Sequence, residues 1–271
     1  MVFEAAEVEA YAFERNFDDS YWVEWMQLTG VKVAFAASVL YVLLIFGFQW
    51  FMTTRERLKF QRALVLWNLA LAVFSAIGSW RMIVALINVL HHGTWHDAIC
   101  DSSHYSNVVS GYWLWACTMS KIIELGDTVF VVSRKSKLIF LHWYHHVATL
   151  LNVWWGYSGR ISTAFLFTVM NLTIHAMMYS YYALRAAGVR VPKPCAMVIT
   201  ALQLSQMFIG VWLCYYVYQV QSQGEECHVS LLQWRLSGLM YLSYFVLFAN
   251  FFYNTYMKGR QGTRRSDAKQ E

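Results

Sequence analysis

Runs of about 20 apolar residues with few or no charged side chains recur along the whole chain, and a helix of that length crosses a bilayer. Of the 271 residues, 58% are hydrophobic and 14% are charged. An ordinary globular domain has roughly 25% charged residues. A membrane β-barrel would show short segments of alternating hydrophobicity instead. We therefore predict an all-α integral membrane protein that lies in the lipid bilayer.

The apolar runs predict seven transmembrane helices. They cover residues 33–52, 63–90, 108–132, 138–157, 161–184, 195–220 and 236–257. This division predicts three parts: an N-terminal segment at 1–32, a seven-helix membrane domain at 33–257 and a basic tail at 258–271.

Lysine and arginine are distributed unevenly between the two sides of this arrangement. Four segments on one side, 53–62, 133–137, 185–194 and 258–271, hold 15 of the 21 basic residues. Such an excess is typical of cytoplasmic loops, so we expect a lumenal N terminus and a cytosolic C terminus. The net charge of +5 follows this topological bias, and we expect no nucleic-acid partner.

Two cysteines fall in loops on the expected lumenal side. Cys100 follows the second predicted helix and Cys227 precedes the seventh. Disulfides form in that compartment, which favours a Cys100–Cys227 bridge, with two free thiols as the alternative.

The fourth predicted helix carries three histidines, His142, His145 and His146, within an apolar run. Spacings of three and four residues place the three rings on one helical face. Neutral imidazole suits proton transfer, nucleophilic attack and metal ligation, so the spacing alone leaves all three roles open.

Other polar side chains also lie within the predicted helices, in the cytoplasmic half of the membrane or near its middle, as the histidines do. They are Lys121, Glu124, Asp127, Asn171, His175, Tyr179, Tyr182, Gln203 and Gln206. Polar groups are costly in a membrane and usually face a cavity, which indicates one interior site. Two simpler roles remain open: an interhelical hydrogen bond for each glutamine, and a structural ion pair for Lys121 with Glu124.

A metal centre is a competing interpretation, because di-iron desaturases and hydroxylases use several histidine boxes. A second box, His91-His92-Gly-Thr-Trp-His96, is present. It follows the second predicted helix, on the side opposite to His142. Only four of the nine histidines can reach the candidate site, so we predict no metal there. A seven-span receptor or transporter is a further alternative, against which the histidine cluster argues.

Four motifs in this order resemble those of the very-long-chain fatty acid elongases, the membrane 3-ketoacyl-CoA synthases. They are Lys121-x-x-Glu124-Leu125-x-Asp127-Thr128, His142-Trp-Tyr-His145-His146, the run from Met170 to Tyr182, and Thr200-x-x-Gln203-x-x-Gln206. The resemblance implies seven helices, six of which enclose an acyl-chain tunnel closed at the lumenal end, in the endoplasmic reticulum membrane. It also implies condensation of a long-chain acyl-CoA with malonyl-CoA, without a bound cofactor. The chain looks most like members acting on saturated and monounsaturated acyl groups of about palmitate length, and members acting on longer saturated chains are the alternative.

The resemblance implies roles for individual residues as well. His145 is the expected nucleophile, His175 the base or oxyanion stabiliser, and His142 and His146 the groups that orient the site. The remaining polar residues are expected to position substrate. Lys137, Arg190 and Lys193 are candidate contacts for the CoA phosphates, although the cytoplasmic excess of basic residues explains them equally well. Expected partners are the ketoacyl reductase, dehydratase and enoyl reductase of the elongation cycle, and a homo- or hetero-oligomer is possible.

Overall fold

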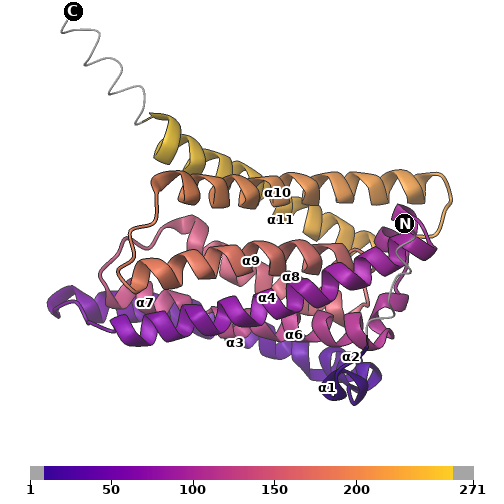
Figure 1. Cartoon of the computed structure of the whole chain (residues 1–271), viewed down its shortest axis with the longest axis horizontal. Coiled ribbons are helices and arrows are strands. Elements are labelled where there is room, and N and C mark those ends of the chain that lie inside the picture. The colour runs from indigo at the N-terminus through magenta and orange to yellow at the C-terminus, as the bar shows by residue number, and fades with distance from the viewer. Residues whose placement is uncertain (1–8, 259–271) are drawn as a thin grey trace, which may run out of the picture.

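The computed structural model describes residues 9–258, and its long helices run side by side along the long axis of the molecule (Figure 1). Every regular element in this range is helical. The α-helices are α1 (Ala12–Arg15), α2 (Asp19–Trp25), α3 (Val31–Phe51), α4 (Gln61–His92), α5 (Trp95–Cys100), α6 (Val108–Glu124), α7 (Asp127–Ser133), α8 (Phe140–Ser158), α9 (Ala164–Ala186), α10 (Lys193–Ser222) and α11 (Leu231–Phe252). One π-helical turn, Met26–Gly30, joins α2 to α3, and another, Tyr253–Met257, follows α11. Of the predicted basic tail, all but Lys258 lies outside the described residues.

Four helical stretches of the described chain are long and apolar enough to cross a membrane. They are Asp19–Thr54, Gln61–His92, Lys193–Ser222 and Leu231–Met257. The other long helices, α6, α8 and α9, carry the polar residues that the sequence singles out. Helix α6 is the shortest of the three, with 17 residues. These four stretches confirm the prediction of an α-helical membrane protein.

Six long helices form a ring in which each helix contacts the next. The order of neighbours is α4, α9, α10, α11, α8 and α6, and α6 contacts α4 again. The helix α3 packs against α8 and α7 instead, and in Figure 1 it lies on the side opposite to α10. This arrangement leaves α3 outside the circuit that surrounds the candidate site.

One predicted helix is broken. Residues 108–132 were expected to form a continuous span, but α6 ends at Glu124 and α7 begins at Asp127. Gly126 lies at the break, where a Cβ atom would come within 2.7 Å of Trp67. Asp127 accepts hydrogen bonds from Trp67 on α4 (2.6 Å) and from Tyr179 on α9 (2.8 Å). Apolar periodicity does not reveal this break, because tertiary partners hold the turn.

The N-terminal segment is anchored to the bundle by a buried ion pair. Nε of Arg81 on α4 donates to Glu14 on α1 at 2.8 Å, and the Trp113 indole donates to the same carboxylate at 2.8 Å. Both charged side chains are almost fully buried. A buried charge is tolerated when it is paired and hydrogen-bonded in this way, which explains an arginine in the middle of an apolar helix.

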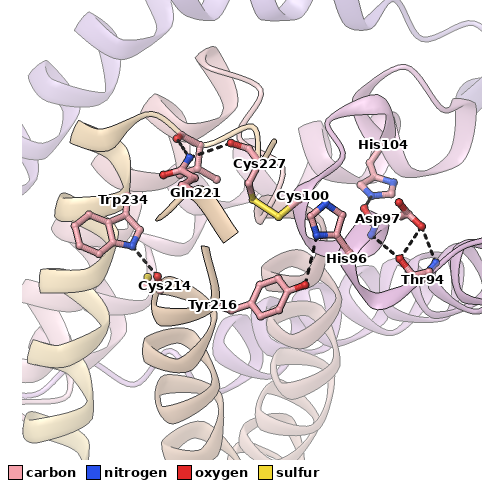
Figure 2. Close-up of a disulfide and its surroundings, with 11 residues drawn as sticks. Thr94, His96, Asp97, Cys100, His104, Cys214, Tyr216, Gln221, Cys227 and Trp234 are labelled. Atoms are coloured by element: carbon pink, nitrogen blue, oxygen red, sulfur yellow. Dashed lines mark hydrogen bonds between the residues drawn. A yellow bond between two sulfur atoms is a disulfide. The ribbon is translucent and has the colours of Figure 1, made fainter. Parts of the chain in front are cut away.

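A disulfide joins Cys100, the last residue of α5, to Cys227, which lies in the segment between α10 and α11 (Figure 2). The two cysteines are 127 residues apart in the sequence. Next to the disulfide, the Tyr216 hydroxyl shares a hydrogen bond with Nδ1 of His96 (Figure 2). Cys117, Cys195 and Cys214 are free thiols.

Candidate active site

A cavity of about 650 Å³ lies among α4, α7, α8, α9, α10 and α11. All four histidines of the candidate site line it: His142, His145, His146 and His175. The acids Glu124 and Asp127 also line it, as do Asn171, Tyr179, Tyr182, Gln203 and Gln206. The structure therefore brings the predicted polar residues of five helices, α6 to α10, to one place. Lys121 is the exception, and it lines the second cavity described next.

A smaller inner cavity of about 70 Å³ adjoins the first one and is lined mainly by apolar and aromatic side chains. Four residues line both cavities: His145, Asn171, Gln206 and Met207. His142 and His146 line the outer cavity alone. His145 is therefore the one member of the histidine box at the junction between a more polar outer chamber and a mainly apolar inner one.

Helix α8 presents the box as the spacing predicts, with the rings packed against one another. The ring centroids of His142 and His146 are 4.7 Å apart, and those of His145 and His146 are 5.8 Å apart. Tyr244 of α11 packs against the His145 ring at 5.0 Å and donates its hydroxyl to the His145 carbonyl at 3.1 Å. This second contact restrains α8 at the residue that joins the two cavities.

Lys121 connects α6 to α9 through a buried polar network. Its ammonium donates to Glu124 at 2.7 Å and to Oδ1 of Asn171 at 2.7 Å. Ser120 donates a further hydrogen bond to Glu124 at 2.8 Å. Lys121 and Glu124 are each about 95% buried, so the ion pair predicted from their spacing is present and also reaches the neighbouring helix.

The network determines how His175 is oriented. Because Oδ1 of Asn171 accepts from Lys121, its Nδ2 faces His175 and lies 3.1 Å from Nε2 of the ring. An amide nitrogen is a donor, so Nε2 is the accepting nitrogen and the ring proton resides on Nδ1. Nδ1 lies 3.7 Å from the Glu124 carboxylate. At this distance no hydrogen bond joins the two groups, so Glu124 acts on His175 through its charge, and the hydrogen bond from Asn171 holds the ring.

The remaining predicted residues lie around this centre. Gln203 donates to the Met178 sulfur at 3.2 Å, an interhelical contact of the kind that the sequence left open. Gln206 is buried and lines both cavities. Tyr182 lines the outer cavity, although its side chain is half-exposed.

Two residues near the site were missed in the sequence. Trp67 on α4 holds Asp127, and Tyr41 on α3 shares a hydrogen bond of 2.7 Å with Thr128. Thr128 in turn shares a hydrogen bond of 2.9 Å with Nε2 of His142. Tyr41 carries a hydroxyl in the middle of the very apolar helix α3. That hydroxyl could have predicted a polar contact with another helix.

The basic residues at the outer cavity differ from the predicted ones. Arg134 and Arg185 line it, whereas Lys137, Arg190 and Lys193 are exposed and do not. These three residues lie in or beside the connections between helices. An excess of lysine and arginine in such connections is typical of the cytoplasmic side of a membrane protein.

The second histidine box lies apart from the first. His96 lines an open pocket beside the Cys100–Cys227 disulfide, together with His228. Within residues 9–258, no group of three or more His, Cys, Asp or Glu residues has the geometry to hold a metal ion.

With this geometry established, comparison with known proteins identifies the family. The sequence model of the GNS1/SUR4 family, ELO, matches residues 26–264. The chain belongs to that family. Very long chain fatty acid elongase 6 of Gallus gallus is 42% identical over 261 residues, which are 96% of this chain and 97% of the relative. The human protein of the same name is 41% identical over 260 residues, with the same two coverages.

A second group of GNS1/SUR4 relatives is somewhat more distant. Very long chain fatty acid elongase 3 of Homo sapiens is 36% identical over 255 residues, which are 92% of this chain and 91% of the relative. The resemblance to fatty acid elongases is confirmed, and the desaturase and receptor alternatives do not agree with it.

Proposed function

We propose that this protein is the condensing enzyme of microsomal fatty acid elongation. It joins a saturated or monounsaturated acyl-CoA of about palmitate length to malonyl-CoA and releases a 3-ketoacyl-CoA, carbon dioxide and CoA. The observation that carries the proposal is the position of His145, which lies where the more polar outer cavity meets the mainly apolar inner one. A thioester carbonyl at His145 would have an apolar chamber for its chain on one side and a polar chamber for its CoA on the other.

The first half of the reaction is acyl transfer to the enzyme. A neutral nitrogen of His145 attacks the thioester carbonyl, the carbon–sulfur bond breaks, and CoA leaves as its thiol after taking up a proton. Splitting one difficult step into two in this way is the advantage of covalent catalysis. A chamber lined by apolar side chains protects the acyl-imidazole from water.

The second half forms the carbon–carbon bond. Malonyl-CoA loses carbon dioxide, and the resulting enolate attacks the acyl carbonyl on His145 and releases the imidazole. His175 is placed to take up a proton at its accepting Nε2, because the Glu124 charge 3.7 Å from Nδ1 favours a positive ring, and the protonated ring can then donate to the developing oxyanion. His142 and His146 orient the thioester from the outer cavity.

The remaining polar residues position substrate or hold the residues that do. Lys121 fixes Asn171 and Glu124, and Asp127 is held by Tyr179 at 2.8 Å. Tyr182, Gln203 and Gln206 line the outer cavity together with His145.

The CoA phosphates belong at the outer cavity in this proposal. Arg134 and Arg185 line it and would meet the phosphates first. Lys137, Arg190 and Lys193 remain candidates for the outer part of the nucleotide, where long-range attraction between opposite charges is sufficient.

The same proposal includes the membrane arrangement. Seven helices cross the endoplasmic reticulum membrane with a lumenal N terminus and a cytosolic C terminus, and the closed order of six helices supports a tunnel inside them. Residues 1–32 are then the lumenal segment, 33–257 the membrane domain and 258–271 the cytosolic tail. The ketoacyl reductase, dehydratase and enoyl reductase of the cycle would act on the product, and the enzyme could work as a homo- or hetero-oligomer.

The test uses purified full-length protein, palmitoyl-CoA and radiolabelled malonyl-CoA. We expect wild type to form ketoacyl product and His145→Ala to form less than about 1% as much, as for removal of a covalent nucleophile. His228→Ala is the matched control, because that histidine lies beside the disulfide. With palmitoyl-CoA alone, wild type should gain the mass of one palmitoyl group and His145→Ala should not.

The outcomes separate the parts of the proposal. Absence of product from wild type would refute the function, and full activity of His145→Ala would refute the nucleophile. A series of acyl-CoAs of increasing length distinguishes a preference for palmitate from the preference for longer saturated chains.

A further inference from the structure

The hydroxyl of Tyr41 reaches the histidine box from outside the circuit of six helices. The side chain is 6% exposed, on the face of α3 that packs against α8. Its oxygen lies 2.7 Å from Oγ1 of Thr128, and that atom lies 2.9 Å from Nε2 of His142. Three groups on α3, α7 and α8 thus form a chain of hydrogen bonds that ends on the first histidine of the box.

The chemistry of the three groups determines the direction of this chain. Within residues 9–258, Thr128 is the sole hydrogen-bond partner of the Tyr41 hydroxyl. If the threonine proton pointed to Tyr41, the tyrosine proton would be buried without an acceptor, which is unfavourable. Tyr41 therefore donates to Thr128. The single proton of Thr128 is then free to donate to Nε2 of His142.

A ring that accepts at Nε2 carries its proton on Nδ1. His142 is then neutral, and its N–H group is the one available to the outer cavity that the residue lines. The adjacent His146 ring, 4.7 Å away between centroids, limits rotation of His142 about its side-chain bonds. The Nδ1–H group of His142 could there donate a hydrogen bond to an oxygen of a thioester or a carboxylate.

We propose that Tyr41 is a positioning residue of the acyl-transfer site, which acts through Thr128 to hold His142 as the Nδ1–H tautomer facing the cavity. The inference rests on the proposed function and adds a residue from a helix that does not line the cavity. Ser38, three residues before Tyr41, shows the contrast. It donates to Ala34 of its own helix at 2.8 Å, whereas the Tyr41 hydroxyl is used across helices and ends on an imidazole nitrogen.

The test compares kcat and KM of wild type, Tyr41→Phe, Thr128→Val, Thr128→Ser and the Tyr41→Phe/Thr128→Val double variant. Loss of one neutral hydrogen bond predicts a fall in kcat of about 3- to 10-fold in Tyr41→Phe and in Thr128→Val, with KM unchanged. Because the two residues act in series, the double variant should be no slower than Thr128→Val. Thr128→Ser keeps the hydroxyl and should restore kcat to near the wild-type value.

Tyr216→Phe is the matched control, because it also removes a tyrosine hydroxyl that is bonded to a histidine, His96, but beside the disulfide (Figure 2). Its kcat should equal that of wild type. Variants are compared when they elute as a single species and unfold within a few degrees of wild type.

A purely structural role for Tyr41 would lower stability without this pattern of kcat. Wild-type kcat in Tyr41→Phe, or independent and multiplying effects of the two substitutions, would overturn the inference. If Tyr41→Phe does not fold, equal kcat values in Thr128→Ser and Thr128→Val overturn it instead. Inactive wild type would refute the proposed function, whereas active wild type with an unaffected Tyr41→Phe refutes the role of Tyr41 alone.

Discussion

Asn171 and His175 lie one turn apart on α9, and the amide nitrogen of Asn171 is 3.1 Å from Nε2 of His175. The orientation of that amide is not free, since its oxygen accepts from Lys121 at 2.7 Å. A lysine on α6 therefore determines which nitrogen of a histidine on α9 carries the proton.

Replacement of Asn171 by aspartate should disturb this arrangement without much change in size. The carboxylate has no donor for Nε2, so it would draw the ring proton to Nε2 and away from Glu124. We expect kcat to fall by about 10- to 100-fold, the effect of a lost hydrogen bond to a charged or reacting group. Steady-state kinetics with palmitoyl-CoA and malonyl-CoA measure it. An Asn171→Asp variant as fast as wild type would contradict the assigned tautomer.

Lys121→Met should destabilise the protein, because it leaves the Glu124 carboxylate buried without a counter-charge. Breaking a buried pair on one side typically costs about 3–5 kcal/mol. The Lys121→Met/Glu124→Leu double variant removes both charges and should recover much of that loss. Thermal unfolding in detergent checks the comparison, and a double variant less stable than Lys121→Met would count against it.

Reduction of the Cys100–Cys227 disulfide should lower stability, since it releases a constraint between residues 127 apart. We expect Cys100→Ser to reduce the free energy of unfolding by about 2–5 kcal/mol. Mass spectrometry of non-reduced peptides should find the two cysteines linked in protein isolated from membranes. Cys195→Ser, at an exposed free thiol, is the control and should unfold like wild type. Two free thiols at 100 and 227 would refute the bridge.

Acid should destabilise the loop between α5 and α6 through His104. Burial lowers the pKa of His104 below its ordinary value of 6.5, although the Asp97 carbonyl and the Asp101 carboxylate oppose this effect. A histidine that stays neutral when folded contributes stability that is complete above its unfolded pKa and is lost as the pH falls below it. The unfolding temperature should therefore decline between pH 7 and pH 5.

His104→Phe should flatten that decline, because the ring stacks on Phe165 at 4.0 Å and phenylalanine can replace it there. The two nearby acids do not interfere in this range. The pKa values of Asp97 and Asp101 are lowered from 3.8, so their contribution is lost at lower pH. If the unfolding temperature of His104→Phe declined with pH as steeply as that of wild type, another group would be responsible for the decline.

The inner cavity should limit the acyl chain. Ala164, the first residue of α9, lines it, and a larger side chain there would shorten the apolar chamber. We expect Ala164→Phe to lower the rate with palmitoyl-CoA by about tenfold or more relative to a shorter acyl-CoA, since overpacking a filled space is costly. Rates across a series of acyl lengths provide the measurement. An unchanged length preference would place the end of the chain elsewhere.

Hydropathy and charge along the chain determined the class of fold, the approximate limits of the long helices and the cysteines of the disulfide. These properties are local: a run of apolar residues must leave water wherever it lies, and a helix must satisfy its own backbone in lipid. The motifs likewise predicted most of the polar residues that line the outer cavity, because their spacing puts them on shared helical faces.

What the tertiary structure decided is how those residues meet. The break between Glu124 and Asp127 depends on Trp67 and Tyr179, and the proton of His175 depends on Lys121. The link from Tyr41 to His142 joins residues 101 positions apart through a third helix. No periodicity encodes such contacts, since hydrogen-bond partners on different helices are set by how the helices pack.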